Sequence, residues 1–156
     1  MPLTLVGVTY LLASQASGVL KQIFDRARPP RAFPQITTLL PLPHDASFPS
    51  GHAATSFACA VVLAAFLQSR RSRSLLFALA ALIALSRVYV GVHYPLDVVV
   101  GAALGAVIGA AALQATRFIG EGRRSDLFAR FEDAGDDDGD AGEKGDPETD
   151  AASAGR

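Results

Sequence analysis

Four long apolar stretches follow one another along the chain, separated by short polar segments. None of the four contains a Lys, Arg, Asp or Glu side chain: residues 1–20, 46–69, 74–86 and 98–116. A helix rises about 1.5 Å per residue, so about 20 residues cross a hydrocarbon layer that is roughly 30 Å thick. Each stretch approaches that length when its polar ends are included. The pattern therefore predicts membrane-spanning helices.

We expect four such helices, at residues 3–24, 50–68, 74–91 and 95–117. The alternative is a soluble bundle of unusually apolar helices. A helix of a soluble protein should show a polar stripe at helical spacing, and the segment from Leu75 to Leu85 shows none. The predicted fold class is therefore all-α, a transmembrane helical bundle of about four spanning helices.

The formal net charge of -1 over 156 residues hides two very different parts. Residues 1–131 carry twelve Lys/Arg against five Asp/Glu, whereas residues 132–156 carry two against ten. The acidic end has too few apolar side chains to order itself. We therefore expect a transmembrane core at residues 1–120 and a cytoplasmic tail at residues 121–156, disordered from about residue 132.

Arginines mark the expected cytoplasmic side. They fall between the second and third helices and after the fourth: Arg70, Arg71, Arg73, Arg117, Arg123 and Arg124. Basic loops tend to stay in the cytoplasm. The other two connections, including the loop at residues 29–49 with six of the nine prolines, then lie outside. We expect this loop to be extended rather than helical and to lie at the surface of the plasma membrane.

Two cations precede the proline-rich loop, in the segment Lys21-Gln22-Ile23-Phe24-Asp25-Arg26-Ala27-Arg28-Pro29. If the first helix continues that far, Lys21 and Arg28 share one face, because seven residues make almost two turns. Two cations on one face repel each other unless an anion lies between them, and a phosphate suits both. The plainer interpretation is a solvated basic helix end in which Asp25 pairs with Lys21.

The second apolar helix is preceded by Phe48-Pro49-Ser50-Gly51-His52. Ser50 is a good N-cap, and Gly51 lets a ligand approach the backbone. The free amides and the dipole of a helix N-terminus favour an anion. His52, in the first turn, could then move a proton. An ordinary helix start with an interfacial histidine is the alternative.

The third polar group is Ser86-Arg87-Val88-Tyr89-Val90-Gly91-Val92-His93-Tyr94-Pro95-Leu96-Asp97. Pro95 suits the first turn of a helix, which would let Asp97 face back and accept the ring N–H of His93. The other ring nitrogen would then be free to attack. Arg87 can meet His93 only if its helix ends near Gly91. Otherwise Arg87 snorkels to the interface and the other two residues form a polar cap.

Together the three groups resemble the type 2 phosphatidic acid phosphatase superfamily. Its motifs are Lys-x6-Arg-Pro, Pro-Ser-Gly-His and Ser-Arg-x5-His-x3-Asp. The chain matches each of them in full and in order, at Lys21/Arg28/Pro29, Pro49/Ser50/Gly51/His52 and Ser86/Arg87/His93/Asp97.

The resemblance implies a catalytic role for three residues. His93 would be the nucleophile, Asp97 would orient it, and His52 would protonate the departing oxygen and later activate water. The remaining motif residues would hold the phosphoryl oxygens: Lys21, Arg28, Ser50, Gly51 and Arg87. Such a cradle can replace metal ions, because phosphoryl transfer depends mainly on positioning and charge stabilisation. We expect no cofactor and no metal, and the three histidines and single cysteine show no zinc-like spacing.

The chain departs from the family pattern at its start. Membrane members usually have six spanning helices, with the first motif after the third, whereas this chain has about four. We expect either that the family core stands alone or that the recorded start is truncated. Small residues on the first helix could pack against a missing helix or a second subunit, so homo-oligomerisation stays open: Gly7, Ser14, Ser17 and Gly18.

The predicted function is hydrolysis of a lipid phosphate or polyprenyl pyrophosphate in the bilayer through a phosphohistidine, at an extracytoplasmic site. Nucleic acid is not an expected partner. Two alternatives are a catalytically silent lipid-binding or scaffold protein and a vanadate-dependent haloperoxidase relative. The sequence does not choose among phosphatidate, phosphatidylglycerol phosphate, diacylglycerol pyrophosphate and polyprenyl pyrophosphate.

Overall fold

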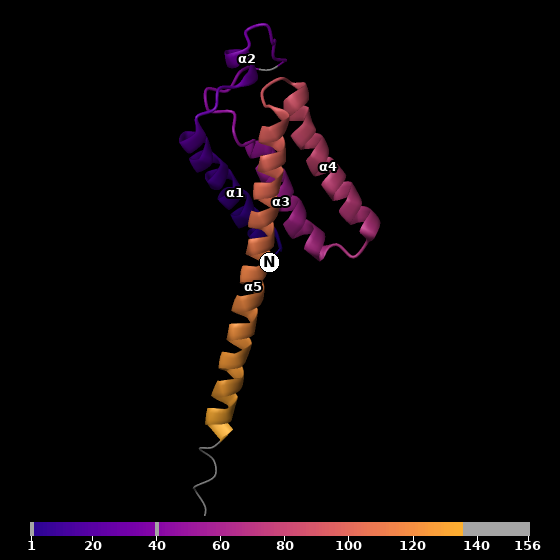
Figure 1. Ribbon diagram of the computed structural model, residues 1–156. Coiled ribbons are helices and arrows are strands. Elements are labelled where there is room, and N and C mark those ends of the chain that lie inside the picture. Colours follow the sequence, from indigo (N-terminus) through magenta and orange to yellow (C-terminus); the bar gives the residue numbers. More distant parts are fainter. Residues whose placement is uncertain (1, 40, 136–156) are drawn as a thin grey trace, which may run out of the picture. The chain divides into compact units, whose positions relative to one another are not determined.

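The computed structural model describes residues 2–39 and 41–135, and every regular element in these ranges is a helix (Figure 1). The elements are α1 (Pro2–Phe24), α2 (Pro29–Ala32), α3 (Gly51–Phe66), α4 (Arg70–Tyr89) and α5 (Pro95–Gly135). The prediction of an all-α fold is confirmed. The acidic tail was predicted to be disordered from about residue 132; residues 132–135 form the end of α5, and the rest of the tail lies outside the described residues.

Small residues let α3 serve as the centre of the bundle. It packs against both α1 and α4, and its buried side chains are short: Ala53, Ala54, Ala58, Ala60, Val62 and Ala64. Phe57 reaches from α3 to Phe77 on α4, with ring centroids 6.4 Å apart. Alanines allow close approach of the helix backbones, as is usual where helices associate in lipid.

Three glycines bring α5 directly against the backbone of α3. A Cβ atom on Gly101, Gly105 or Gly109 would lie 2.5, 2.0 or 2.8 Å from the carbonyl oxygen of Ser50, Ala54 or Ala58, respectively. Glycines at this four-residue spacing lie on one face of α5, and that face is a helix-packing surface. It also places the first turn of α3 beside the first turn of α5, where the Ser50 amide donates to the Asp97 carbonyl at 2.9 Å.

Replacing Gly105 with alanine should destabilise the bundle by about 1–3 kcal/mol or more, as overpacking of a closely packed interior does. The added methyl meets a backbone carbonyl, which cannot rotate away as a side chain would. Gly7→Ala on α1 is the control, because a Cβ there has nothing within 4 Å. Unfolding in detergent should show Gly105→Ala as clearly weaker and Gly7→Ala as equal to the parent or more stable. Equal stability of both variants would contradict the packing argument.

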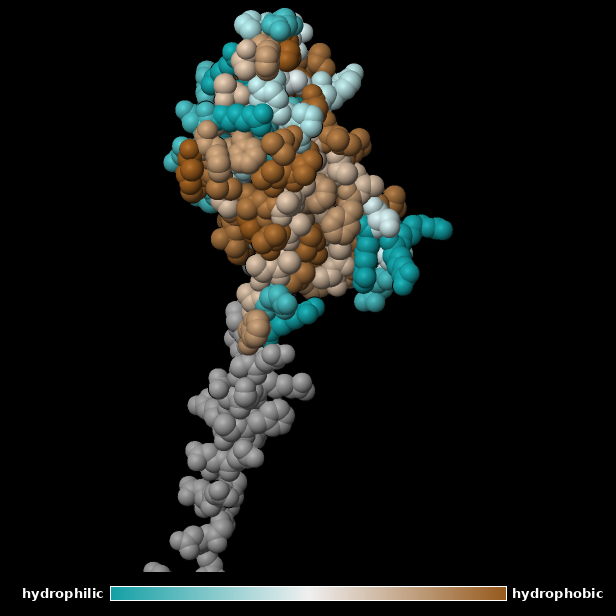
Figure 2. Space-filling view, in the orientation of Figure 1, coloured by the Kyte–Doolittle hydropathy of each residue, from teal (hydrophilic) through white to brown (hydrophobic). Residues whose placement is uncertain are grey.

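Three segments are long and apolar enough to cross a membrane: Leu3–Ala32, Arg70–Tyr89 and Pro95–Phe118. The remaining long helix, α3, has 16 residues and is shorter than the roughly 20 that span a bilayer. Figure 2 shows the corresponding apolar band across the bundle, with hydrophilic residues above it at the end that carries α2 and again at the α3–α4 connection.

The predicted helix boundaries are correct in part and wrong in part. The basic segment after α3 is not a loop, because Ser69 caps α4 by accepting from the Ser72 amide (3.4 Å) and the helix begins at Arg70. The predicted end of the first helix at residue 24 is confirmed: α1 ends at Phe24 and Asp25 has a positive φ of 37°, so Lys21 and Arg28 do not share a helix face. The proline-rich loop contains the short helix α2, since prolines suit a first helical turn. Beyond residue 117, α5 continues to Gly135 through a segment without proline.

Candidate active site

One cavity of about 220 Å³ brings parts of all three sequence motifs together. Six of the eight predicted site residues line it: Lys21, Arg28, Gly51, His52, Arg87 and His93. The other two, Ser50 and Asp97, are fully buried. The two histidines therefore face one cavity, although they come from α3 and from the turn between α4 and α5.

The turn that carries His93 depends on an early end to α4. This helix stops at Tyr89, and Gly91 adopts a φ of 81°, a left-handed conformation that glycine takes at little cost. The chain then reverses, so that Arg87 and His93 line the same cavity, as the sequence required. The Arg87 guanidinium is braced by its neighbour Ser86, whose Oγ lies 3.1 and 3.0 Å from Nε and Nη2.

The surroundings of His93 fix which ring nitrogen carries the proton. Nε2 lies 3.3 Å from Nη1 of Arg28. A guanidinium can only donate, so Nε2 must offer its lone pair and Nδ1 must hold the hydrogen. Nδ1 lies 3.5 Å from Oδ2 of Asp97, and within the described residues it has no partner in hydrogen-bond geometry. The Nε2 lone pair thus points toward the cationic side of the cavity.

Asp97 is held by donors from three segments. Nη1 of Arg26 donates to Oδ1 at 2.7 Å, the Tyr94 amide donates to Oδ2 at 3.0 Å, and the Ser47 hydroxyl donates to Oδ2 as well. The bond from the Tyr94 amide is one that an acidic residue in the first turn of a helix commonly accepts from an amide at the start of that helix. Two donors already occupy Oδ2, which explains why Nδ1 of His93 remains at 3.5 Å.

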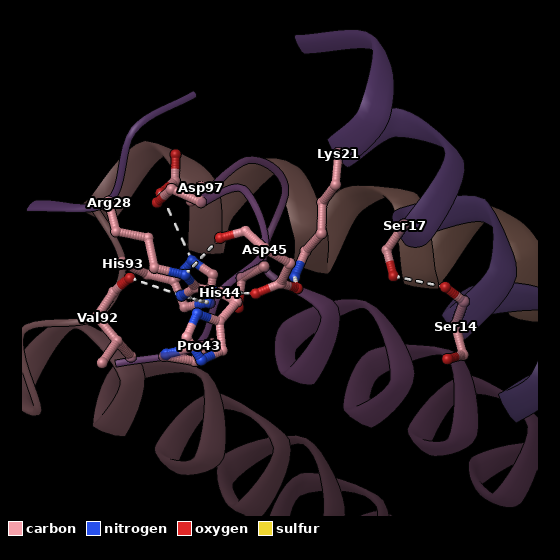
Figure 3. A network of polar contacts seen from close by, with 12 residues as sticks. Ser14, Ser17, Lys21, Arg28, Pro43, His44, Asp45, Val92, His93 and Asp97 are labelled. Carbon is pink, nitrogen blue, oxygen red and sulfur yellow. Dashed lines mark hydrogen bonds and ion pairs between the residues drawn. The ribbon is translucent and has the colours of Figure 1, made fainter. Parts of the chain in front are cut away.

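The two cations of the first motif meet on an unexpected partner (Figure 3). Lys21 Nζ and Arg28 Nη2 both contact the carboxylate of Asp45, the latter at 2.6 Å. Lys21 thus pairs with Asp45 and not with Asp25, the partner in the plainer interpretation of this segment. Arg28 is 2% exposed and also donates to the Val92 carbonyl at 2.9 Å. The chain turns after Phe24, and this turn, rather than a shared helix face, brings the cations together.

Ser50 and Gly51 begin α3 as the sequence suggested. Ser50 is the N-cap, and its hydroxyl accepts from the Ala53 amide at 3.5 Å. Its side chain is buried and does not line the cavity, whereas Gly51 does. A Cβ on Gly51 would lie 3.3 Å from Oγ of Ser17, so a larger residue would crowd the wall between α1 and α3.

Sequence reasoning missed three residues that shape the site: Arg26, Asp45 and Ser47. Arg26 lies over the Tyr94 ring, with its guanidinium carbon 4.0 Å from the centroid, and pairs with Asp97. One signal could have identified Asp45. It is the only acidic residue between Pro29 and Pro49, a loop that follows a strongly basic segment.

The imidazole of His93 should stay neutral far below the usual range. Burial and the adjacent Arg28 lower its pKa to about 4 from 6.5, although the Asp97 charge opposes this. Titration of the ¹⁵N-histidine-labelled protein in micelles should therefore show His93 protonating near pH 4. The imidazole is then neutral at every higher pH, and its protonation begins only as pH falls toward that value. Variants at His44 and His52 assign the other two signals, and a His93 pKa at or above 6.5 would contradict the burial argument.

The comparisons with known proteins agree with these motifs. The PAP2 superfamily model matches residues 2–120. The chain is 36% identical over 104 residues to decaprenylphosphoryl-5-phosphoribose phosphatase of Mycobacterium tuberculosis, covering 67% of this chain and 55% of the relative. It is 38% identical over 113 residues to undecaprenyl-diphosphatase of Sulfolobus acidocaldarius, covering 72% and 53%. The chain thus spans about half the length of these curated relatives.

Two solved structures share the fold. The crystal structure of Aquifex aeolicus LpxE matches with a TM-score of 0.67 and 35% identity, over 72% of this chain and 67% of that one. The first transmembrane PAP2 type phosphatidylglycerolphosphate phosphatase from Bacillus subtilis matches with a TM-score of 0.60 and 26% identity, over 74% and 59%. This chain has apolar helices of its own, and together with the likeness to these proteins they identify it as a multi-pass membrane protein. The match across most of the chain, in sequence and in fold, places this protein in the PAP2 superfamily.

Proposed function

We propose that this protein is a metal-independent phosphatase that hydrolyses a lipid phosphate or polyprenyl diphosphate through a phosphohistidine. The observation that carries the proposal is the position of His93. Its Nε2 lone pair faces Arg28 in a cavity also lined by Lys21 and His52, while Asp97 lies behind the ring. A nucleophile, cations for the phosphoryl oxygens and a second imidazole are the groups that such a reaction requires.

The first chemical step forms a phosphorus–nitrogen bond. Nε2 of His93 attacks phosphorus, the bond from phosphorus to the lipid oxygen breaks, and His52 gives its proton to that oxygen. The ring of His93 becomes positively charged, and the Asp97 carboxylate beside Nδ1 stabilises this charge. Because the phosphoryl group carries negative charge throughout, Lys21, Arg28 and Arg87 hold its oxygens.

The second step returns the enzyme to its starting state. His52 takes a proton from water, the water oxygen attacks phosphorus, and the phosphorus–nitrogen bond breaks. Inorganic phosphate leaves, with His93 neutral again. Gly51 contributes a position where the phosphoryl group can approach the start of α3, whose dipole favours an anion.

The lipid has room beside the phosphoryl cavity. A second cavity of about 390 Å³ shares Lys21, Asp45, Gly51 and His52 with the first. It continues along α1 and α3 past hydroxyl-bearing side chains: Tyr10, Ser14, Ser17 and Thr55. This polar groove suits a head group that carries its own hydroxyls or a second phosphate. We place the cavity on the extracytoplasmic side of the plasma membrane, opposite the arginines at the start of α4.

The relatives direct the choice of substrates to test. Two of them are named as phosphatases of polyprenyl-linked phosphates. Phosphate release in detergent should be measured with undecaprenyl diphosphate, undecaprenyl phosphate, phosphatidylglycerol phosphate and phosphatidate, with and without a chelator. We expect release from at least one polyprenyl substrate, unchanged by the chelator. No release from any of them by a folded protein would reject the proposal.

A further inference from the structure

One carboxylate holds both cations of the first motif. Oδ1 of Asp45 lies 2.6 Å from Nη2 of Arg28, and Oδ2 accepts from Nζ of Lys21. The other guanidinium nitrogen, Nη1, is the one that contacts Nε2 of His93. The Asp45 carboxylate is therefore bound by the same arginine that touches the nucleophile. Figure 3 shows it between Arg28 and Lys21. Two phosphoryl oxygens in its place would receive the same donors.

The backbone around Asp45 is fixed, but its carboxylate is not enclosed. The Asp45 carbonyl accepts from Nε of Arg28 at 3.0 Å, and the Ser47 amide donates to the Arg26 carbonyl at 2.8 Å. Arg31 donates to the carbonyls of Pro43 and His44, the two residues before Asp45. The Asp45 side chain is 51% exposed, whereas that of Arg28 is 2% exposed. Rotation of one side chain is therefore enough to free Nη2 of Arg28 and Nζ of Lys21, without any opening of the loop.

We propose that Asp45 is a displaceable anion, which occupies the phosphoryl subsite when it is empty and yields it to a phosphoryl group. The proposal rests on the proposed function, because it assigns Lys21 and Arg28 to the substrate. An incoming dianion takes over both donors, and the Asp45 carboxylate turns toward solvent. After hydrolysis the carboxylate returns and competes with bound phosphate, which favours product release.

A carboxylate that occupies the subsite weakens the binding of every ligand that must displace it. When the competent, open form of a site is only a fraction of the population, every ligand binds more weakly by that fraction. A dianion overcomes the competition of a single carboxylate, whereas monoanions such as phosphodiester head groups bind too weakly to persist. Hydrogen bonds and ion pairs with Lys21 and Arg28 hold the pKa of Asp45 at about 2, although its partial burial opposes this. The competing charge is therefore present at every physiological pH.

The Asp45→Asn variant tests the proposal, because it keeps the shape of the side chain and removes its charge. We expect the inhibition constants of inorganic phosphate and orthovanadate to fall by on the order of 10- to 100-fold, the range that two charge-assisted hydrogen bonds justify. Asp25→Asn is the matched control. It removes one negative charge from the same rim, and asparagine tolerates the positive φ found there.

The opposite role predicts the opposite result. If Asp45 only aligned Lys21 and Arg28, Asp45→Asn would weaken phosphate binding, and an unchanged or raised inhibition constant therefore overturns the proposal. Asp45→Ser, a smaller side chain without charge, should bind phosphate more tightly in the same way. Thermal unfolding in detergent confirms that each variant is folded.

Two further measurements are needed. One tells whether a lipid head group, as well as free phosphate, displaces Asp45, and the other tests the displaceable anion independently of the proposed function. A lower KM for the lipid in Asp45→Asn shows that the head group displaces Asp45, and a lower phosphate inhibition constant supports the proposal even if KM is unchanged. Equilibrium binding of ³²P-phosphate needs no turnover. If the protein hydrolyses no lipid, the proposed function fails, whereas tighter phosphate binding by Asp45→Asn would still support the displaceable anion.

Discussion

Replacing His93 with alanine should abolish phosphate release from every lipid substrate, with a loss on the order of 10⁴-fold or more. The variant removes the only ring nitrogen in the described structure whose lone pair faces Arg28 in the cavity. The cations would still bind the phosphoryl group, so substrate binding should survive while chemistry stops. Phosphate release and equilibrium binding of orthovanadate measure the two properties separately.

A covalent intermediate makes this prediction more specific. Brief exposure of the parent to a ³²P-labelled substrate, followed by an alkaline quench, should leave label on a peptide that contains His93. The His93→Ala variant should carry no label. His44→Gln, on the exposed part of the loop, is the histidine control and should retain both label and turnover. Equal turnover by parent and His93→Ala would reject the phosphohistidine proposal.

The convergence of the three motifs could be predicted because each one sits at a helix end. The apolar stretches predict four crossings of the bilayer, and alternate crossings would return the chain to the same side. Lys21, His52 and His93 must then lie near one rim, and they line one cavity. The spacing of Gly101, Gly105 and Gly109 likewise indicates a smooth face on α5, and this face lies against the α3 backbone.

The details between the helices could not be predicted in the same way. Two neighbouring cations such as Lys21 and Arg28 need an anion between them, and we expected substrate phosphate to be that anion. In the structure Asp45 provides it. Its position depends on the left-handed turn at Asp25 and on the path of a proline-rich loop, neither of which follows from hydrophobic periodicity.

The hydrogen-bond donors to Asp97 could not be predicted for a related reason. The spacing from His93 to Asp97 indicates a pair, and they are neighbours at 3.5 Å. The donors that hold the carboxylate, Arg26 and Ser47, lie about 71 and 50 positions away in the chain. Contacts at that separation depend on tertiary packing.

Replacing His52 with glutamine should lower turnover of a lipid monophosphate by on the order of 10²–10⁴-fold, the usual contribution of a general acid–base group. A lipid alkoxide leaves poorly unless it receives a proton, and His52 faces the cavity where that oxygen would depart. An activated aryl phosphate has a leaving group that departs without protonation. Formation of the phosphohistidine from that substrate should therefore be slowed much less.

Separate measurement of phosphohistidine formation and of its hydrolysis distinguishes an acid role of His52 from a structural one. Since His52 also activates water, the variant should accumulate labelled phosphohistidine from the aryl substrate and release phosphate from it slowly. His44→Gln again provides the control, because it changes a histidine outside the cavity. If His52→Gln slowed formation of the intermediate equally for alkyl and aryl substrates, His52 would be a binding residue rather than the proton donor. The burst of aryl alcohol in single-turnover measurements decides between these roles.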